Sequence, residues 1–193
     1  MDKRQFLGAA ALAGALPLPA QAARPAQRGP TLLTVTGAIG RGNRGPLDPV
    51  RDQMMYKQQL KFDKAHAFDH ADLLQLAPHT IRPTLEYDAK PHLLRGPLLV
   101  DVLARAGARL DDGTLLVLRA VDGYNVELPL ADARRRRFIV ATHVDGQPMA
   151  LGGLGPLWAV YDADRVPEMA RLPLPQRFAA CPWALYHVEV KAN

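Results

Sequence analysis

The second half of the chain contains two Asp-Gly pairs, a pattern that is typical of tight turns. Asp122-Gly123 and Asp145-Gly146 each lie between short stretches that are rich in branched and aromatic residues. Asp-Gly favours tight turns in which the glycine takes a left-handed conformation, and such turns join antiparallel strands. The second half of the sequence therefore predicts short strands joined by hairpins.

The same patterns predict the other elements of the chain. The expected strands are 31–37, 115–121, 124–128, 138–144, 157–161 and 183–190. Helix formers fill 49–62, Asp69 is a helix cap before Leu73, and Gly96-Pro97 begins the clearest helix, which Gly107 ends. The proline-rich stretch 165–182 is expected to follow the surface without strand pairing. The predicted fold class is α+β, dominated by strands.

The first residues have the pattern of an export signal. Lys3 and Arg4 precede an apolar run from 6 to 18, and Ala20-Gln21-Ala22 is a small-x-small cleavage site. We therefore predict a signal peptide at 1–22, a linker at 23–30, one domain at 31–193 and a periplasmic location. The twin-arginine and general secretory routes both stay open, and no later run is long enough to span a membrane.

Composition excludes several classes of protein. The chain is 48% hydrophobic and 22% charged, which is typical of a packed globular domain. The net charge of +5 is concentrated in the run Arg134–Arg137, without the basic stripe of a nucleic-acid surface. Most of that run is expected in solvent, and one or two of its members are suited to holding a phosphate or carboxylate. The single cysteine, Cys181, excludes a disulfide scaffold and a cysteine-rich metal site, and it is expected to be buried.

His66 and His70 are the one histidine pair with a spacing that suits a metal. Four residues apart, they would share one face of a helix, with Asp69 beside them. A metal carrier that uses these three residues is one hypothesis, and surface histidines without a metal are the preferred alternative. We predict no metal site.

Several short blocks, in this order, resemble the molybdopterin-binding domain of the sulfite-oxidase family. They are Gly96–Leu103, Ala120–Tyr124, Asp145–Met149, Gly155–Trp158 and Cys181–Trp183. The resemblance covers most of the chain after the signal, and the chain is similar to small, stand-alone exported members of that family. It implies a sulfite-oxidase-type α+β fold, with molybdopterin as the possible cofactor.

The chain departs from that family at two positions that matter for the cofactor. The family's metal-binding cysteine belongs to the stretch that here is 82–88 and holds Glu86 but no cysteine, and Cys181 lies far along the sequence. The family's basic anchor in the Gly155–Trp158 block is also missing. The resemblance, with these departures, predicts a degenerate member without cofactor that binds a small molecule or a periplasmic or membrane-associated protein. An atypical molybdopterin-dependent oxidoreductase is the alternative.

Six residues are the candidates for lining the cleft that this fold would provide. They are Asn43, Arg44, Glu86, Tyr87, Tyr124 and Trp158. Aromatic rings would supply stacking area and polar groups would orient a ligand. Tyr124 and Trp158 also suit the hydrophobic core, and the sequence leaves both alternatives open for these two.

Overall fold

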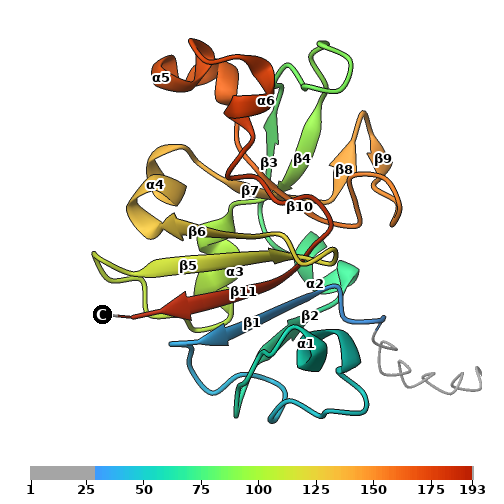
Figure 1. Ribbon diagram of the computed structural model, residues 1–193, viewed down its shortest axis with the longest axis vertical. Helices are drawn as coiled ribbons and strands as arrows, with labels where there is room; N and C mark the ends of the chain where they lie inside the picture. Colours follow the sequence, from blue (N-terminus) through green and yellow to red (C-terminus); the bar gives the residue numbers. More distant parts are fainter. Residues whose placement is uncertain (1–28, 193) are drawn as a thin grey trace, which may run out of the picture.

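A computed structural model describes residues 29–192 of the protein (Figure 1). The predicted signal peptide and residues 23–28 of the predicted linker lie outside the described residues. Within the described range, no helix has the length and apolar character needed to cross a membrane.

Short strands and short helices make up a strand-rich α+β fold, as the sequence predicts. The strands are β1 (Leu33–Gly37), β2 (His66–Phe68), β3 (Pro78–Ile81), β4 (Leu94–Pro97), β5 (Leu115–Ala120), β6 (Asn125–Pro129), β7 (Ile139–Ala141), β8 (His143–Val144), β9 (Gln147–Pro148), β10 (Trp158–Val160) and β11 (Leu185–Lys191). The helices are α1 (Gln53–Lys57), α2 (His70–Leu74), α3 (Leu99–Arg105), α4 (Leu130–Arg135), α5 (Pro167–Ala170) and α6 (Leu174–Arg177), with a 3-10 turn at Ala163–Arg165.

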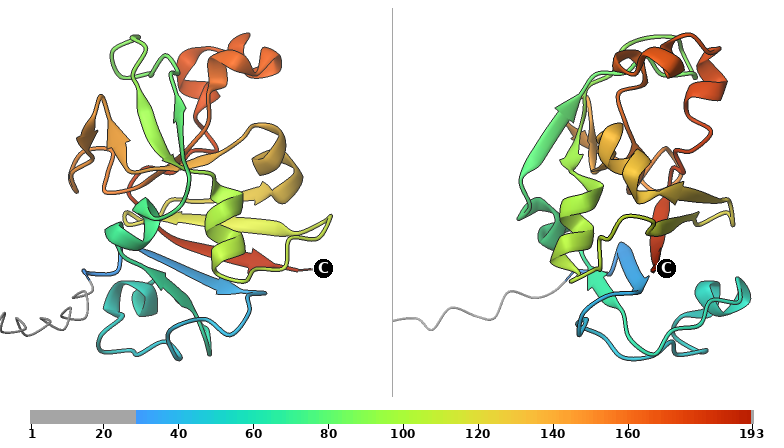
Figure 2. Two further views of the ribbon diagram at one scale, coloured as in Figure 1. Left: turned by 180° about the vertical axis from the view of Figure 1, so that it is seen from behind. Right: turned by 90° about the vertical axis from the view of Figure 1, so that its left-hand side faces the viewer.

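The largest sheet places the last strand in its middle. Its order is β2-β1-β11-β5-β6, with β11 parallel to β1 and antiparallel to β5. Both β1 and β11 are buried on both faces, which explains their continuous apolar character. One face is covered by α3, whose Leu99, Val102 and Leu103 are fully buried (Figure 2).

A second group of strands, β3-β4-β8-β9 with the pair β10-β7, continues the structure above that sheet (Figure 1). Within this group, the four-stranded sheet meets the β10-β7 pair where β4 packs on β7. Gly96 makes this contact possible, because a Cβ atom there would lie 1.9 Å from the carbonyl oxygen of Val140. The Gly96-Pro97 pair therefore belongs to β4, and the helix expected from it begins only at Leu99.

Most of the predicted elements are confirmed, with shifted boundaries. Each of the six predicted strand stretches contains a strand, with 138–144 split into β7 and β8, and Gly107 adopts the left-handed conformation (φ 71°) after α3. Asp69 caps α2 in a capping box with Asp72. The helix expected over 49–62 is only the single turn and a half of α1, and β3 and β4 were not predicted.

The contact between β4 and β7 gives the first test. Gly96→Ala would force these two backbones apart, so we expect it to lower the free energy of unfolding by at least about 2 kcal/mol. Urea denaturation of the purified protein measures this. The control is Gly45→Ala, where an added Cβ meets nothing within 4 Å and stability should hardly change. A loss of the same size at both positions would contradict the close packing described here.

A buried histidine joins three neighbouring strands of the large sheet. His187 of β11 is 1% exposed, and its Nδ1 accepts a hydrogen bond from Arg119 at 3.1 Å. Its Nε2 must then carry the proton, which it donates to the Thr36 hydroxyl at 3.0 Å. Burial, together with the charge of Arg119, lowers the pKa of His187 from 6.5 to about 3. The ring is therefore neutral at neutral pH.

This low pKa predicts a pH dependence of stability. As the pH falls below 6.5, His187 of the unfolded chain binds a proton, whereas His187 of the folded protein binds one only near pH 3. The free energy of unfolding therefore decreases as the pH falls from 6.5 toward 3. We expect the free energy of unfolding to be roughly 1 to 2 kcal/mol lower at pH 5 than at pH 7 because of this group. His187→Gln should lose that part of the slope, while His79→Gln, which lies outside the large sheet, should keep it. Parallel slopes for wild type and His187→Gln would contradict the prediction.

Candidate functional site

Three of the six candidate residues line one cavity of about 280 Å³, which we call the Glu86 cavity. Glu86 and Tyr87 come from the loop between β3 and β4, and Tyr124 from the turn between β5 and β6. The other lining residues are Asp122, Pro175, Phe178, Ala179, Cys181, Pro182 and Trp183. Segments far apart in the sequence therefore converge here, as they do in most ligand sites.

A histidine fixes the loop that carries Glu86 and Tyr87. His92 contacts Asp145 through Nδ1 at 2.7 Å and Asp88 through Nε2 at 3.1 Å. Its pKa is raised, first by the hydrogen bond to Asp145 and then by Asp88. His92 thus links the loop to the Asp145-Gly146 turn and positions the two cavity residues. Sequence reasoning missed this role, because Asp145 lies 53 residues from His92 and Asp88, four residues before it, forms no recognisable motif with it.

Aromatic side chains form the rim of the cavity. Tyr87, Tyr124 and Trp183 are 57%, 49% and 38% exposed, so their rings are available to a ligand. The Tyr124 hydroxyl donates a hydrogen bond to the Ala179 carbonyl oxygen at 2.6 Å, which holds that ring in place. Partial burial, and then Glu86, raise the pKa of Tyr87 to about 12, so this phenol stays protonated beside the carboxylate.

Cys181 lies in the wall of the same cavity and is 4% exposed. Its burial confirms the sequence expectation, and the fold brings it together with the Glu86 stretch although the two lie far apart in the sequence. Burial raises the pKa of the thiol far above its ordinary value. The side chain is therefore a protonated thiol at neutral pH.

Trp158 supports this cavity from behind and does not line it. The residue is 1% exposed, its Nε1 donates to the Cys181 carbonyl oxygen at 2.9 Å, and its ring lies 5.9 Å from that of Phe178. Of the two alternatives that the sequence left open, the structure places Trp158 in the core and Tyr124 on the rim.

Asn43 and Arg44 lie elsewhere, in the loop after β1. The Asn43 amide makes two hydrogen bonds to the backbone of Ala67, at 2.9 and 2.7 Å. Arg44 pairs with Asp52, and its guanidinium lies 5.2 Å from the centre of the Phe62 ring. The expectation that these two residues meet Glu86 in one cleft is therefore wrong. Asn43 holds a long loop against β2, and Arg44 joins parts of that loop to one another.

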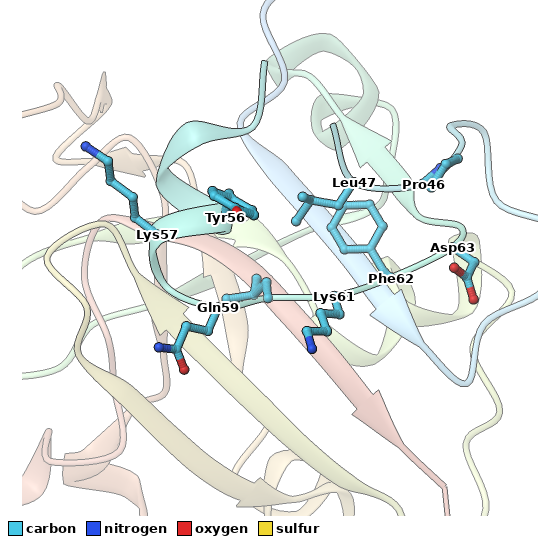
Figure 3. Close-up of a pocket in the computed structure, with 9 residues that line it drawn as sticks. Pro46, Leu47, Tyr56, Lys57, Gln59, Lys61, Phe62 and Asp63 are labelled. Carbon is cyan, nitrogen blue, oxygen red and sulfur yellow. The ribbon is translucent and has the colours of Figure 1, made fainter. Parts of the chain in front are cut away.

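Another cavity, of about 650 Å³ and more than twice the volume of the Glu86 cavity, is formed by that loop (Figure 3). Figure 3 shows Tyr56, Phe62 and Leu47 beside it, with Lys57 and Lys61 at its edge. All of its lining residues come from the single stretch 46–63. We prefer the Glu86 cavity as the functional site, because it gathers carboxylates, aromatic rings and a thiol from three separate segments.

The histidine pair does not share a helix face, so that expectation is wrong. His66 lies in β2 with its ring against Phe68, whereas His70 begins α2 with its ring 5.8 Å from that of His143. Between residues 29 and 192, no three His, Cys, Asp or Glu side chains are grouped so that they could hold a metal ion.

Comparison with known proteins gives a likeness of fold. No family model and no curated protein matches the sequence. Among solved structures, the chain is similar to the sulfane dehydrogenase SoxCD from Paracoccus pantotrophus, with a TM-score of 0.53 and 12% sequence identity. The match covers 83% of this chain but only 38% of that one, and at this identity it shows a shared fold alone.

The two tryptophans near the cavity give a matched test. Trp158→Phe removes a buried hydrogen bond and part of the core, so we expect a loss of about 2 to 3 kcal/mol in the free energy of unfolding. Trp183→Phe changes an exposed ring and should cost less than about 1 kcal/mol. Chemical denaturation of both variants measures the difference, and similar losses would contradict the positions assigned to the two rings.

Proposed function

We propose that this chain is an exported binding module on a sulfite-oxidase-type molybdopterin-binding fold, with a small-molecule site at the Glu86 cavity. The fold shared with part of SoxCD supports the architecture that the sequence blocks imply. The export signal and the periplasmic location come from the sequence pattern of the first 22 residues. The observation that carries the proposal is the lining of the cavity, which has two carboxylates and three exposed aromatic rings.

This lining does not fit molybdopterin. The cofactor is an anion with a phosphate group, and it needs basic side chains or backbone donors to hold that charge. None of the ten residues that line the cavity is Lys or Arg, and Glu86 and Asp122 would both repel the phosphate. The one sulfur ligand on offer, Cys181, is a buried thiol whose raised pKa favours its neutral form.

The same lining suits a ligand that is cationic. Tyr87, Tyr124 and Trp183 offer ring faces, which attract cations with about 0.5 to 2 kcal/mol each. Glu86 and Asp122 add charge opposite to that of the ligand, and Tyr87 stays protonated beside Glu86. The volume of about 280 Å³ suits a small organic ammonium compound.

One observation favours the alternative, an atypical molybdopterin-dependent oxidoreductase. Cys181 lines the same cavity as Glu86 and Tyr87, although 94 residues separate it from Tyr87. A metal that bound this thiol would deprotonate it, so the raised pKa alone does not exclude a ligand role for Cys181. The test must therefore measure the cofactor directly.

We expect protein isolated from the periplasm of a host that fills other molybdoenzymes to contain neither molybdenum nor pterin. Elemental analysis and pterin fluorescence measure this. Near-stoichiometric amounts of both would overturn the binding-module proposal in favour of the oxidoreductase. In that case Cys181→Ser should abolish molybdenum incorporation.

The ligand class is tested with tetramethylammonium chloride as the probe, by calorimetric titration at constant ionic strength. We expect millimolar binding that Glu86→Gln weakens by about tenfold, through loss of one opposing charge. Glu127→Gln is the control, since Glu127 is an exposed carboxylate on β6 that pairs with Lys191 outside the cavity. Absence of binding, or equal weakening by both variants, would overturn the assignment of a cationic ligand.

A further inference from the structure

Basic side chains are prominent in the lining of another cavity, of about 240 Å³. Three successive residues of the arginine run, 135–137, face it together with Arg165 and His79, and Asp162 is the one acidic residue in its lining. We call this the arginine cleft. It adjoins another hollow that shares Asp162 and Arg165 and adds one basic and one acidic residue, Arg82 and Asp164. The Glu86 cavity has none of these residues in its lining, so the two sites are separate.

Three successive arginines can line one cleft because the helix that carries them ends there. Helix α4 stops at Arg135, Arg136 follows it, and Arg137 takes a left-handed conformation with φ of 54°. Glycine is the residue that adopts this conformation with least strain at a helix end. In this position the Arg137 guanidinium lies 3.4 Å from Nδ1 of His79 on β3.

Much of the positive charge of the cleft is not neutralised by the protein. Arg135 is paired with Asp132 and Glu168. The ion pair of Arg136 with Asp132 is long, at 3.9 Å, and its guanidinium lies 5.6 Å from the centre of the Tyr161 ring.

Two further arginines of the cleft have no acidic partner. Arg137 has only His79 as a polar side-chain neighbour, and the Arg165 side chain makes no hydrogen bond or ion pair with residues 29–192. The cleft therefore attracts an anion.

Two buried polar atoms of the cleft residues lack a hydrogen-bond partner. They are Nε of Arg136, which is a donor, and Oδ1 of Asp162, which is an acceptor. Across residues 29–192 only one other side-chain atom, the Thr34 hydroxyl oxygen, is in this condition. Buried donors and acceptors are nearly always paired, and both unpaired atoms belong to residues that line this cavity. A ligand that paired both atoms would accept a bond from arginine and donate one to a carboxylate.

We propose that the arginine cleft binds phosphate. Phosphate offers several oxygens to the guanidinium groups, and at neutral pH it keeps at least one proton to donate to Asp162. Sulfate has the same shape but no proton at neutral pH, so the Asp162 carboxylate repels it. The site therefore prefers phosphate to sulfate, although the guanidinium groups attract both.

The binding test is calorimetric titration of the full chain with sodium phosphate and, separately, sodium sulfate at pH 7.5 and constant ionic strength. We expect phosphate to bind at least tenfold more tightly than sulfate. Arg165→Gln should weaken phosphate binding about tenfold and leave the fold unchanged, because the Arg165 side chain has no partner to lose among the described residues. Arg105→Gln, an exposed arginine on α3, is the matched control and should leave the affinity unchanged.

Asp162→Asn tests the selectivity. The variant replaces the repelling carboxylate with a neutral amide, so the preference for phosphate over sulfate should fall at least tenfold, mainly through tighter sulfate binding. Its melting temperature shows whether the variant is folded, and Arg165→Gln tests the site if it is not. Three results would overturn the proposal: no phosphate binding by the wild type, equal binding of sulfate and phosphate by the wild type, or equal weakening by Arg165→Gln and Arg105→Gln.

Discussion

The parallel pairing of β1 with β11 holds the large sheet together. It joins residues 153 positions apart and places the last strand between the first strand and β5. Both strands are buried on both faces, so neither can form its contacts without the other. The hydrogen bonds of His187 to Thr36 and Arg119 cross the same three strands and leave its ring neutral. The segment before β11 must therefore return to the middle of the large sheet. Cys181 and Trp183 lie on this segment, just before β11, and line the Glu86 cavity.

Sequence patterns predicted the elements that local chemistry determines. The Asp-Gly turns, the Asp69 cap and the strands of the second half depend on turn geometry and β-propensity, which neighbouring residues largely set. The same patterns misplaced the start of α3, because Gly96 has a role that only the partner strand β7 reveals. They also missed β3 and β4, whose pairing depends on contacts with β8 from a distant part of the chain.

The candidate site was predicted in part for a similar reason. Glu86, Tyr87 and Tyr124 were found because they belong to blocks with a recognisable order, and the structure brings them together. Asn43 and Arg44 were misplaced, since a polar loop after a strand has the same composition whether it holds a ligand or its own backbone. Trp158 could not be assigned from sequence, because a tryptophan suits both a core and a binding cleft.

The two cavities carry opposite charge although one segment borders both. Residues 163–182 have no strand pairing, as the proline content predicts, yet they provide Arg165 to the arginine cleft and Pro175 and Phe178 to the Glu86 cavity. Arg177 holds this segment together: its guanidinium donates to the carbonyl oxygens of Ala170 and Leu172 and to the Asp164 carboxylate.

The Arg177 carbonyl oxygen in turn accepts a hydrogen bond from Tyr161, which ties the segment to the end of β10. Asp162 and Asp164 also accept hydrogen bonds from the backbone of Arg82 and Thr84, so the segment is attached to the loop that carries Glu86. These bonds join parts of the protein to one another, so the fold itself sets the walls of both cavities, and a ligand at either site loses little free energy to ordering the protein. A proline-rich surface segment without strands thus helps to shape both sites.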